Sequence, residues 1–294
     1  MKKICCFGSA NIDYVYHMPH FVKPGETLDC MQRDQNAGGK GANQSCAFAH
    51  AGAHVYFAGN IGADGLFLKE NLNRHKVDTS LLRTVDVPTG HAIIQVEQSG
   101  ENCIILFGGA NRMADEAQMD AVLSAFDAGD ILVLQNEING IDLLMAKAKA
   151  KGMSVALNPS PIAENILSLP LQTVDYLFVN ETEGEALSGV SREEADELMD
   201  ALMKLYPNTE IILTLGAKGA MCGSKEGVFT SAAVKSTVVD TTAAGDTFTG
   251  YYLTLRAEGA SIQQAMDTAN LAASVTVSRK GASDSIPWRG ELSV

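Results

Sequence analysis

Short apolar segments alternate regularly with helical patterns along most of the chain, and this alternation limits the folds that the chain can adopt. The expected strands are 4–7, 55–58, 131–134, 154–157, 176–179 and 211–215. The expected helices are 44–51, 64–74, 115–126, 141–151, 181–187, 192–205, 246–258 and 262–278. Apolar strands joined by helices form parallel sheets with right-handed crossovers. The sequence therefore predicts an α/β fold, with a central, mostly parallel sheet covered by helices on both faces.

Two pairs of short strands interrupt this alternation in the first half of the chain. One pair surrounds the turn residues Pro24 and Gly25, and the other flanks a turn at 98–101. Hairpins inserted into a βαβ series predict a small β layer that stands off the main sheet and covers a site. We expect one domain over 1–294, with a lid inserted from about 12–36 and 90–109.

The acidic composition of the chain limits the kinds of molecule that it can bind. A net charge of −13 argues against nucleic acid or an anionic membrane surface as a partner, although a local site can still hold a phosphate. No apolar run is long enough to span a bilayer, and the start of the chain does not resemble a signal peptide, so we expect a cytoplasmic protein. The six cysteines lack zinc-ligand spacing, which favours buried, reduced thiols.

The segment 240–250 carries the strongest chemical signal. Small residues at Ala243, Ala244 and Gly245 allow close approach of a ligand, and a helical pattern follows at once. Unpaired N–H groups and the positive dipole end coincide at a helix N-terminus, which predicts an anion site. Asp246 lies in the first turn, where a carboxylate could accept a proton from an attacking hydroxyl. An ordinary loop with Asp246 as a helix cap is the alternative.

Polar residues also follow the strands of the first half. Asn11 and Asp13 follow the first strand, where the carboxyl end of a sheet strand usually faces the ligand crevice. Lys40 and Asn43 follow glycines that permit close backbone contact. Their side chains supply the donors and acceptors that a polyol requires. Asx turns and a simple glycine-rich turn remain alternatives.

Two further strand ends suggest a nucleotide and its metal ion. Asn180 and Glu183 are three residues apart at the start of a helix, so they can share one face and hold Mg²⁺ through its waters. Helix capping is the alternative for this pair. The segment 214–219 ends another strand with glycines that would let the backbone lie along a nucleotide. The chain has no Walker A loop. It also lacks the dinucleotide-binding Gly-x-Gly-x-x-Gly motif, which argues against a dehydrogenase.

Together these motifs, in this order, resemble the ribokinase family of PfkB-type carbohydrate kinases over nearly the whole chain. The segments that carry the resemblance are 8–13, 38–44, 157–159, 180–183, 214–216, 240–248, 279–282 and 285–289. The Gly-Gly-Lys-Gly-Ala-Asn and Ala-Ala-Gly-Asp-Thr-Phe segments are highly specific as a pair. The resemblance implies that Asp246 is the general base and that the Ala243, Ala244 and Gly245 amides hold the transferring phosphoryl group.

The same resemblance implies roles for other positions. Those matching sugar contacts are Asn11, Asp13, Gly39, Lys40, Asn43 and Glu137. Those matching the nucleotide and Mg²⁺ side are Asn180, Glu183, Thr214, Gly216 and Gly219, with Asn270 at the adenine. Those matching a monovalent cation site, several through backbone carbonyls, are Asp240, Thr242, Thr276, Arg279, Gly281 and Ser285.

The activity implied is ATP-dependent phosphorylation of a small-molecule sugar, D-ribose first, with Mg²⁺ and K⁺ as cofactors. The family also suggests a homodimer paired through the β lid. Two alternatives remain at this stage. One is a kinase of the same family for 2-deoxyribose, fructose or a nucleoside, and the other is a sugar-binding regulator without catalysis.

Overall fold

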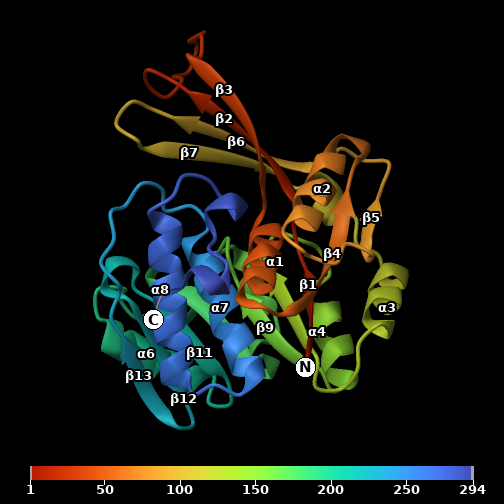
Figure 1. The fold of residues 1–294 in the computed structure, drawn as a ribbon, viewed down its shortest axis with the longest axis vertical. Coiled ribbons are helices and arrows are strands. Elements are labelled where there is room, and N and C mark those ends of the chain that lie inside the picture. Colours follow the sequence, from red (N-terminus) through yellow and green to blue (C-terminus); the bar gives the residue numbers. More distant parts are fainter. Residues whose placement is uncertain (1, 293–294) are drawn as a thin grey trace.

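A large sheet forms the centre of the molecule. The computed structural model describes residues 2–292, so positions 1, 293 and 294 lie outside the description that follows. The strands of the large sheet are β1 (Lys3–Phe7), β4 (His54–Ile61), β5 (Leu82–Thr84), β8 (Ile131–Gln135), β9 (Ser154–Asn158), β10 (Tyr176–Asn180), β11 (Glu210–Thr214), β12 (Ala220–Ser224) and β13 (Gly227–Ser231). Their order is β13-β12-β11-β10-β9-β8-β1-β4-β5 (Figure 1). Only the pairs β11–β12 and β12–β13 are antiparallel within the described sheet, which confirms the predicted mostly parallel architecture.

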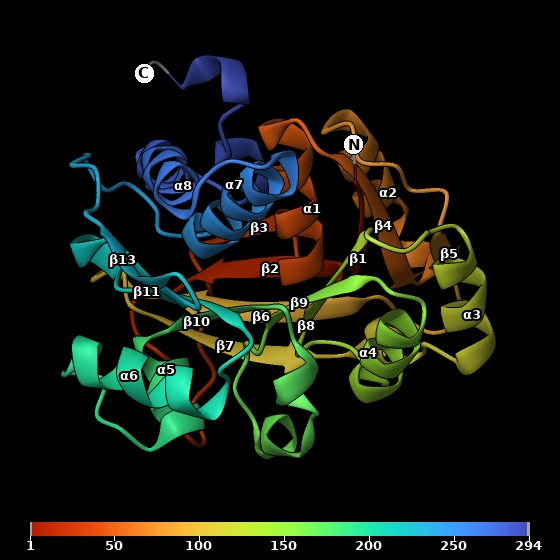
Figure 2. The same ribbon diagram turned by 90° about the horizontal axis from the view of Figure 1, so that it is seen from below.

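Helices cover both faces of this sheet. They are α1 (Lys40–Ala51), α2 (Leu66–Arg74), α3 (Glu116–Ser124), α4 (Ile141–Ala150), α5 (Glu181–Ser188), α6 (Ala195–Leu205), α7 (Ala244–Glu258) and α8 (Ile262–Val277). Helices α1, α7 and α8 lie on one face, whereas α3, α4, α5 and α6 lie on the other (Figure 2). None of the helices described has the length and apolar character needed to cross a bilayer.

Alternate residues of β1 belong to two separate hydrophobic cores, because successive side chains of a strand point to opposite faces of the sheet. Ile4 and Cys6 of β1 belong to the core beneath α1, α7 and α8. Cys5 and Phe7 belong to the core beneath α3 to α6. All four are fully buried. The adjacent cysteines therefore pack on opposite faces, as their spacing predicts.

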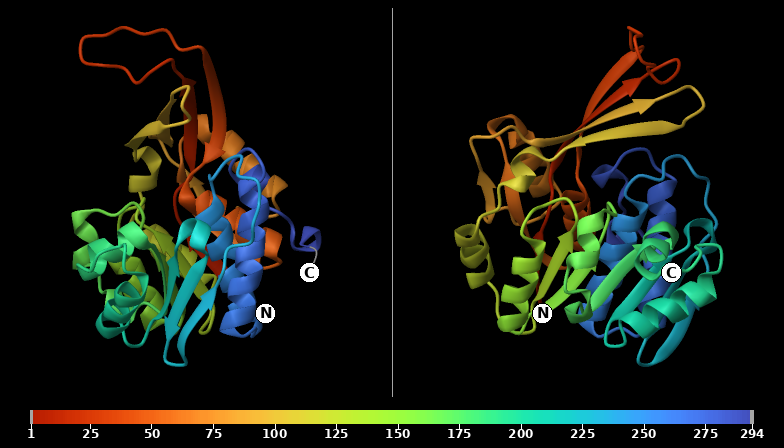
Figure 3. Two further views of the ribbon diagram at one scale, coloured as in Figure 1. Left: turned by 90° about the vertical axis from the view of Figure 1, so that its left-hand side faces the viewer. Right: turned by 180° about the vertical axis from the view of Figure 1, so that it is seen from behind.

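A small sheet, with the strand order β3-β2-β6-β7, stands off the large one. Its strands are β2 (Asn11–His17), β3 (Gln32–Gly38), β6 (Gly90–Val96) and β7 (Asn102–Phe107). In two further views the small sheet and its long β2–β3 connection project from one end of the molecule (Figure 3). The strands occupy nearly the ranges predicted for the lid, although β2 and β3 extend slightly beyond 12–36.

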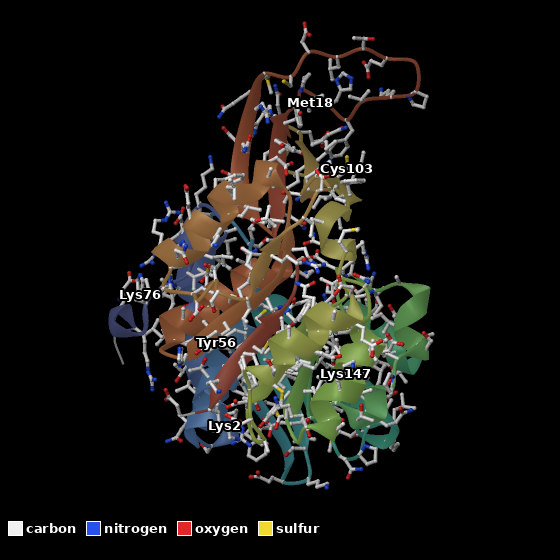
Figure 4. The ribbon with its side chains drawn as sticks, turned by 90° about the vertical axis from the view of Figure 1, so that its right-hand side faces the viewer. Lys2, Met18, Tyr56, Lys76, Cys103 and Lys147 are labelled. Atoms are coloured by element: carbon white, nitrogen blue, oxygen red, sulfur yellow. The ribbon has the colours of Figure 1, made fainter. Side chains whose placement is uncertain are left out.

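Several predicted details need correction. Helix α1 begins at Lys40 rather than at residue 44, because the glycine turn ends at Gly39 and the helix starts directly after it. The short strands β5, β12 and β13 escaped prediction because they lack the long apolar runs of the central strands. Cys30 and Cys103 are exposed, so the prediction of buried thiols is wrong for these two. Cys103 lies on the small sheet, away from the body that carries Tyr56 and Lys147 (Figure 4).

Close packing of α1 against α7 brings the start of each helix to the same edge of the sheet. Gly250 of α7 makes this approach possible: a Cβ built there would lie 2.3 Å from the Ala47 Cβ and 2.9 Å from the Phe48 nitrogen. Both neighbours belong to α1. Any side chain at position 250 would therefore push the two helix backbones apart.

We expect Gly250→Ala to destabilise the protein by about 1 kcal/mol. Overpacking at the helix contact costs about 1–3 kcal/mol, and alanine's higher helix propensity recovers only about 1 kcal/mol. Urea denaturation, followed by circular dichroism, measures the free energy of unfolding. Gly290→Ala is the matched control, because a Cβ there meets no described atom within 4 Å. Equal stability of the two variants would show that α1 and α7 do not depend on this contact.

Candidate active site

A pocket of about 210 Å³ opens at the carboxyl ends of β9, β10 and β11. Residues from these strand ends, from the start of α1 and from the first turn of α7 line it. This is the usual place for a ligand in an open α/β sheet. The lining residues are Lys40, Asn158, Ser160, Phe178, Val179, Asn180, Glu183, Thr214, Thr241, Ala243, Ala244, Gly245, Asp246 and Thr249.

Helix α7 begins with a strained residue at its N-cap. Ala243 has φ 61° and ψ 8°, a left-handed conformation that costs a non-glycine residue about 1–2 kcal/mol. The Ala244 N–H donates to the Thr241 carbonyl, whereas the N–H groups of Gly245 and Asp246 have no acceptor among residues 2–292. A Cβ built on Gly245 would meet no described atom within 4 Å. The turn therefore offers two free donors at the positive end of the helix dipole, as an anion site requires.

The Asp246 carboxylate is half-buried, with protein donors on both oxygens. Gln44 Nε2 donates to Oδ1 at 3.0 Å, and Asn43 Nδ2 approaches Oδ2 at 3.4 Å. Burial raises the pKa of Asp246 above its usual value, while the Lys40 charge and the two amide donors oppose that rise. A partly buried carboxylate whose pKa lies above its usual value is better matched to proton transfer near neutral pH.

The glycine turn before α1 places Lys40 next to Glu137. Oε2 of Glu137 accepts hydrogen bonds from the Ser9 hydroxyl and from the Lys40 backbone N–H, the latter at 3.1 Å. Gly39 has φ 95°, and a Cβ there would lie 2.8 Å from the Asn11 nitrogen. Only glycine combines this conformation with this close approach. The predicted positions Asn11, Gly39, Lys40 and Glu137 therefore lie together in the structure.

The side chains of Asn11 and Asp13 lie at the start of β2, where the small sheet joins the body. The Asn11 side-chain oxygen accepts a hydrogen bond from Asn111 Nδ2 at 2.7 Å. Burial, together with the nearby Glu137 charge, raises the pKa of Asp13 to about 7. A Cβ at Gly38 would lie 1.9 Å from Asp13 Oδ2, so the absence of a side chain at Gly38 makes room for the carboxylate. Two acidic groups thus share a confined space beside Lys40.

Asn180 and Glu183 form a capping box at the start of α5. Asn180 Oδ1 accepts from the Glu183 N–H at 2.8 Å, and Glu183 Oε2 accepts from the Asn180 N–H at 3.0 Å. The capping alternative is therefore realised. Both residues also line the pocket, and Glu183 Oε1 has no hydrogen-bond donor within the described part of the chain. That oxygen is available to a hydrated cation.

The other predicted nucleotide positions are separated in the structure. Thr214 lines the pocket, whereas Gly216, Gly219 and Asn270 are not among its lining residues. Gly219 has φ 103°, and its Cβ would lie 2.1 Å from the Ser231 carbonyl oxygen, so packing explains the glycine. Asn270 Nδ2 donates to the Ser231 hydroxyl at 2.8 Å and so connects α8 to β13. A nucleotide that reached Asn270 would have to extend beyond the pocket.

Asp240, one of the predicted cation positions, links its own segment to the segment around Gly281. Oδ1 of Asp240 accepts from the Thr242 N–H at 2.9 Å, and Oδ2 accepts from the Gly281 N–H at 3.1 Å. Burial opposes ionisation of Asp240, but these hydrogen bonds outweigh it and lower the pKa. The hydroxyls of Thr276 and Ser285 are used in internal hydrogen bonds. Within residues 2–292, no group of three His, Cys, Asp or Glu side chains could hold a metal ion, so backbone carbonyls would have to supply most ligands.

Sequence reasoning assigned no role to several residues that the structure places at the site. Ser9 contacts Glu137, and Gln44 contacts the Asp246 carboxylate. Asn111 holds Asn11, and Gln135 holds Gln44. Ser9 and Gln44 lie within the segments that carried the family resemblance. Asn111 and Gln135 lie outside them, and no spacing in the sequence relates them to their partners.

Comparison with known proteins identifies the family of this chain. The model of the pfkB family of carbohydrate kinases matches residues 1–289. A ribokinase from Haemophilus influenzae is 37% identical, and the alignment covers 99% of this chain and 97% of the relative. The crystal structure of a ribokinase from Cryptococcus neoformans in complex with ADP is 33% identical and has a TM-score of 0.87, with 99% of each chain covered.

A structure of the Arabidopsis thaliana ribokinase complexed with ribose and ATP is also similar. It is 32% identical, with a TM-score of 0.87 and coverage of 99% of this chain and 97% of that chain. These matches extend over both the large sheet and the small sheet. The chain therefore belongs to the pfkB family of carbohydrate kinases.

Proposed function

We propose that this carbohydrate kinase transfers the γ-phosphoryl group of ATP to the primary O5 hydroxyl of D-ribose, with Asp246 as the general base. One observation carries the proposal: the Asp246 carboxylate lies in the same helical turn as two N–H groups that have no acceptor among the described residues. A base and an anion site are thus within one turn of each other. The relatives named as ribokinases, one of them complexed with ribose and ATP, support the choice of substrates.

The reaction requires one proton transfer and one phosphoryl transfer. Asp246 accepts the proton of the sugar hydroxyl, and the freed oxygen forms a bond to the γ-phosphorus as the bond to the leaving ADP oxygen breaks. Such transfers depend on positioning and charge stabilisation more than on covalent chemistry. The free N–H groups of Gly245 and Asp246 would stabilise charge that develops on the phosphoryl oxygens. The positive charge of Lys40 lowers the pKa of Asp246, so it would help to keep the carboxylate ionised and able to accept a proton.

The sugar would bind where the small sheet meets the body. Asp13 and Glu137 would provide carboxylate oxygens for adjacent hydroxyls, beside Asn11, whose side-chain oxygen already accepts from Asn111. The small sheet lies next to this site, so we infer that it acts as a lid that excludes water as a competing acceptor.

We further propose that metal ions assist at two places. Mg²⁺ would lie near Glu183, which lines the pocket and whose Oε1 accepts no hydrogen bond from the described residues. K⁺ would lie near Asp240, between the two segments that this carboxylate joins. A bound cation at either place would supply positive charge beside the phosphates. Turnover measured with and without each ion tests these assignments.

The outer strand of the small sheet supports a homodimer. Ile104, Ile105, Leu106 and Phe107 of β7 are each about half exposed, although they are large and apolar. Apolar residues clustered on an edge strand favour association with a second chain. We propose that two copies pair through their small sheets, which sedimentation of the purified protein would test.

We expect Asp246→Asn to lower kcat by about 10²–10⁴-fold, because a general base contributes about that much. Asparagine has nearly the same shape, so ribose and ATP should still bind, and calorimetry of the variant measures both. Turnover close to that of the wild type would exclude Asp246 as the base. Loss of both binding events would point to a damaged site instead.

We expect ribose to be preferred to 2-deoxyribose by about 10–100-fold in kcat/KM. A hydrogen bond to a charged group contributes about 1.5–3 kcal/mol, and 2-deoxyribose would leave one acceptor unpaired. A coupled assay with both sugars measures the ratio. A ratio near one, or a preference for deoxyribose, fructose or a nucleoside, would favour the alternative substrates. The absence of turnover with any sugar would favour the non-catalytic regulator.

We expect sugar affinity to fall as the pH drops below about 7. The pKa of Asp13 is raised to about 7, so below that pH the group is mostly protonated and one of its two oxygens becomes a donor, which weakens its hydrogen bonds to sugar hydroxyls. The dissociation constant should rise by up to about tenfold per pH unit below it. Calorimetric titration with ribose measures this dependence between pH 5 and 8, roughly the range around the pKa of Asp13. In the Asp13→Asn variant, the affinity for ribose should no longer depend on pH over this range. If the variant kept the pH dependence of the wild type, Asp13 would not contribute to sugar binding.

A further inference from the structure

Two buried glutamines form a hydrogen-bonded chain that ends on the Asp246 carboxylate. Gln44, at the start of the second turn of α1, donates from Nε2 to Asp246 Oδ1 at 3.0 Å. Its Oε1 accepts from Gln135 Nε2 at 2.7 Å. Gln135 is the last residue of β8, and its Nε2 also approaches the Cys6 sulfur at 3.6 Å. The chain therefore joins the large sheet to the first turn of α7 through α1.

The carboxylate sets the direction of both amides. An ionised carboxylate can only accept hydrogen bonds, so Gln44 must present its NH₂ group to Asp246. The Gln44 oxygen then faces Gln135, which must present its own NH₂ group in turn. Reversing both amides would keep the bond between the glutamines but would point the Gln44 oxygen at the charged Asp246. Repulsion between these oxygens excludes the reversed chain while Asp246 is ionised.

This direction leaves one buried atom without a partner. Gln135 Oε1 has no hydrogen bond to any residue that the structure describes. It lies against Gly8, where a built Cβ would come within 2.2 Å of it. An unpaired buried amide oxygen is destabilising. The unpaired oxygen of Gln135 is explained if the hydrogen bonds directed toward Asp246 stabilise the site by more than the missing hydrogen bond costs.

The two carboxylate oxygens are consequently unequal. Oδ1 has the shorter contact, with Gln44, whereas Oδ2 has only the 3.4 Å contact with Asn43. The more weakly held oxygen is the one free to take a proton. We propose that Gln44, held by Gln135, is a positioning residue that fixes Asp246 Oδ1 and leaves Oδ2 to accept the proton from the sugar. This inference depends on the proposed role of Asp246 as the base.

The first test replaces Gln44 by methionine, which fills a similar volume but cannot donate. Loss of a donor to the carboxylate should move the acidic limb of the kcat–pH profile upward by about one unit, which is about a tenfold loss of kcat below that limb. The KM values for ribose and ATP should change by less than about twofold, since neither ligand is proposed to touch Gln44. An unchanged acidic limb in a folded Gln44→Met variant would overturn the proposal.

A matched control comes from another buried glutamine. Gln118 of α3 also uses both ends of its amide: Nε2 donates to the Gly59 carbonyl, and Oε1 accepts from Asn60. We assign it no part in the site. Gln118→Met should therefore leave the acidic limb in place even if it lowers thermal stability. A similar shift in this control would show that the effect follows from general destabilisation, and it would overturn the proposal.

The second test asks whether Gln135 acts through Gln44. Gln135→Met alone should shift the limb in the same direction but by less, because Gln44 would remain as a donor that is free to rotate. In the double variant, Gln135→Met should add no further shift to that of Gln44→Met. Additive shifts would show that the two glutamines act independently, which contradicts the chain. Thermal unfolding, followed by circular dichroism, verifies that each variant is folded.

The Asp246→Asn background separates this inference from the proposed function. If Asp246 is the base, the residual turnover of Asp246→Asn should be insensitive to an added Gln44→Met change. If Asp246→Asn retains nearly full turnover, the base assignment fails and the positioning role fails with it. If Asp246→Asn is inactive but Gln44→Met keeps the wild-type limb, only the positioning role is wrong.

Discussion

The close contact between α1 and α7 is the constraint on which the site depends. Gly250 lets the two backbones approach at Ala47, so the helix starts at Lys40 and Ala244 reach the same edge of the large sheet. Two positive helix ends and one lysine then converge where a phosphate would bind. In a chain with a net charge of −13, these helix starts and Lys40 supply local donors that a phosphate of a nucleotide would need.

The same contact sets the surroundings of the Asp246 carboxylate. Burial disfavours the charge of Asp246, and the groups that oppose this effect all come from α1: Lys40, Asn43 and Gln44. These groups and the carboxylate lie on different helices, so the packing of α1 against α7 sets the surroundings of Asp246. Burial also raises the pKa of Asp13, and there the neighbouring Glu137 charge adds to the rise instead of opposing it. The body and the small sheet therefore carry carboxylates whose pKa values are raised by different surroundings, Asp246 in the body and Asp13 in the small sheet.

Single residues of the site often serve local structure as well. Asn180 and Glu183 cap α5 while they line the pocket, so the capping and ligand-binding interpretations of that motif are compatible. Gly39 is required by its left-handed backbone and by its approach to Asn11, whether or not it touches a sugar. Gly219 and Asn270 have structural explanations that involve Ser231, and their contact with a nucleotide remains a proposal. Local structure and ligand contact can therefore select the same residue.

The sequence by itself determined the alternation of strands and helices, the polar residues at strand ends and the small-residue turn before Asp246, because each depends on neighbours a few positions apart. Only the tertiary structure decided the strand order, the antiparallel β12–β13 edge and the partners of Asp246. Gln44 lies 202 positions from Asp246, and Gln135 lies 91 positions from Gln44. Such contacts follow from how helices and strands pack in three dimensions, and no local periodicity encodes them.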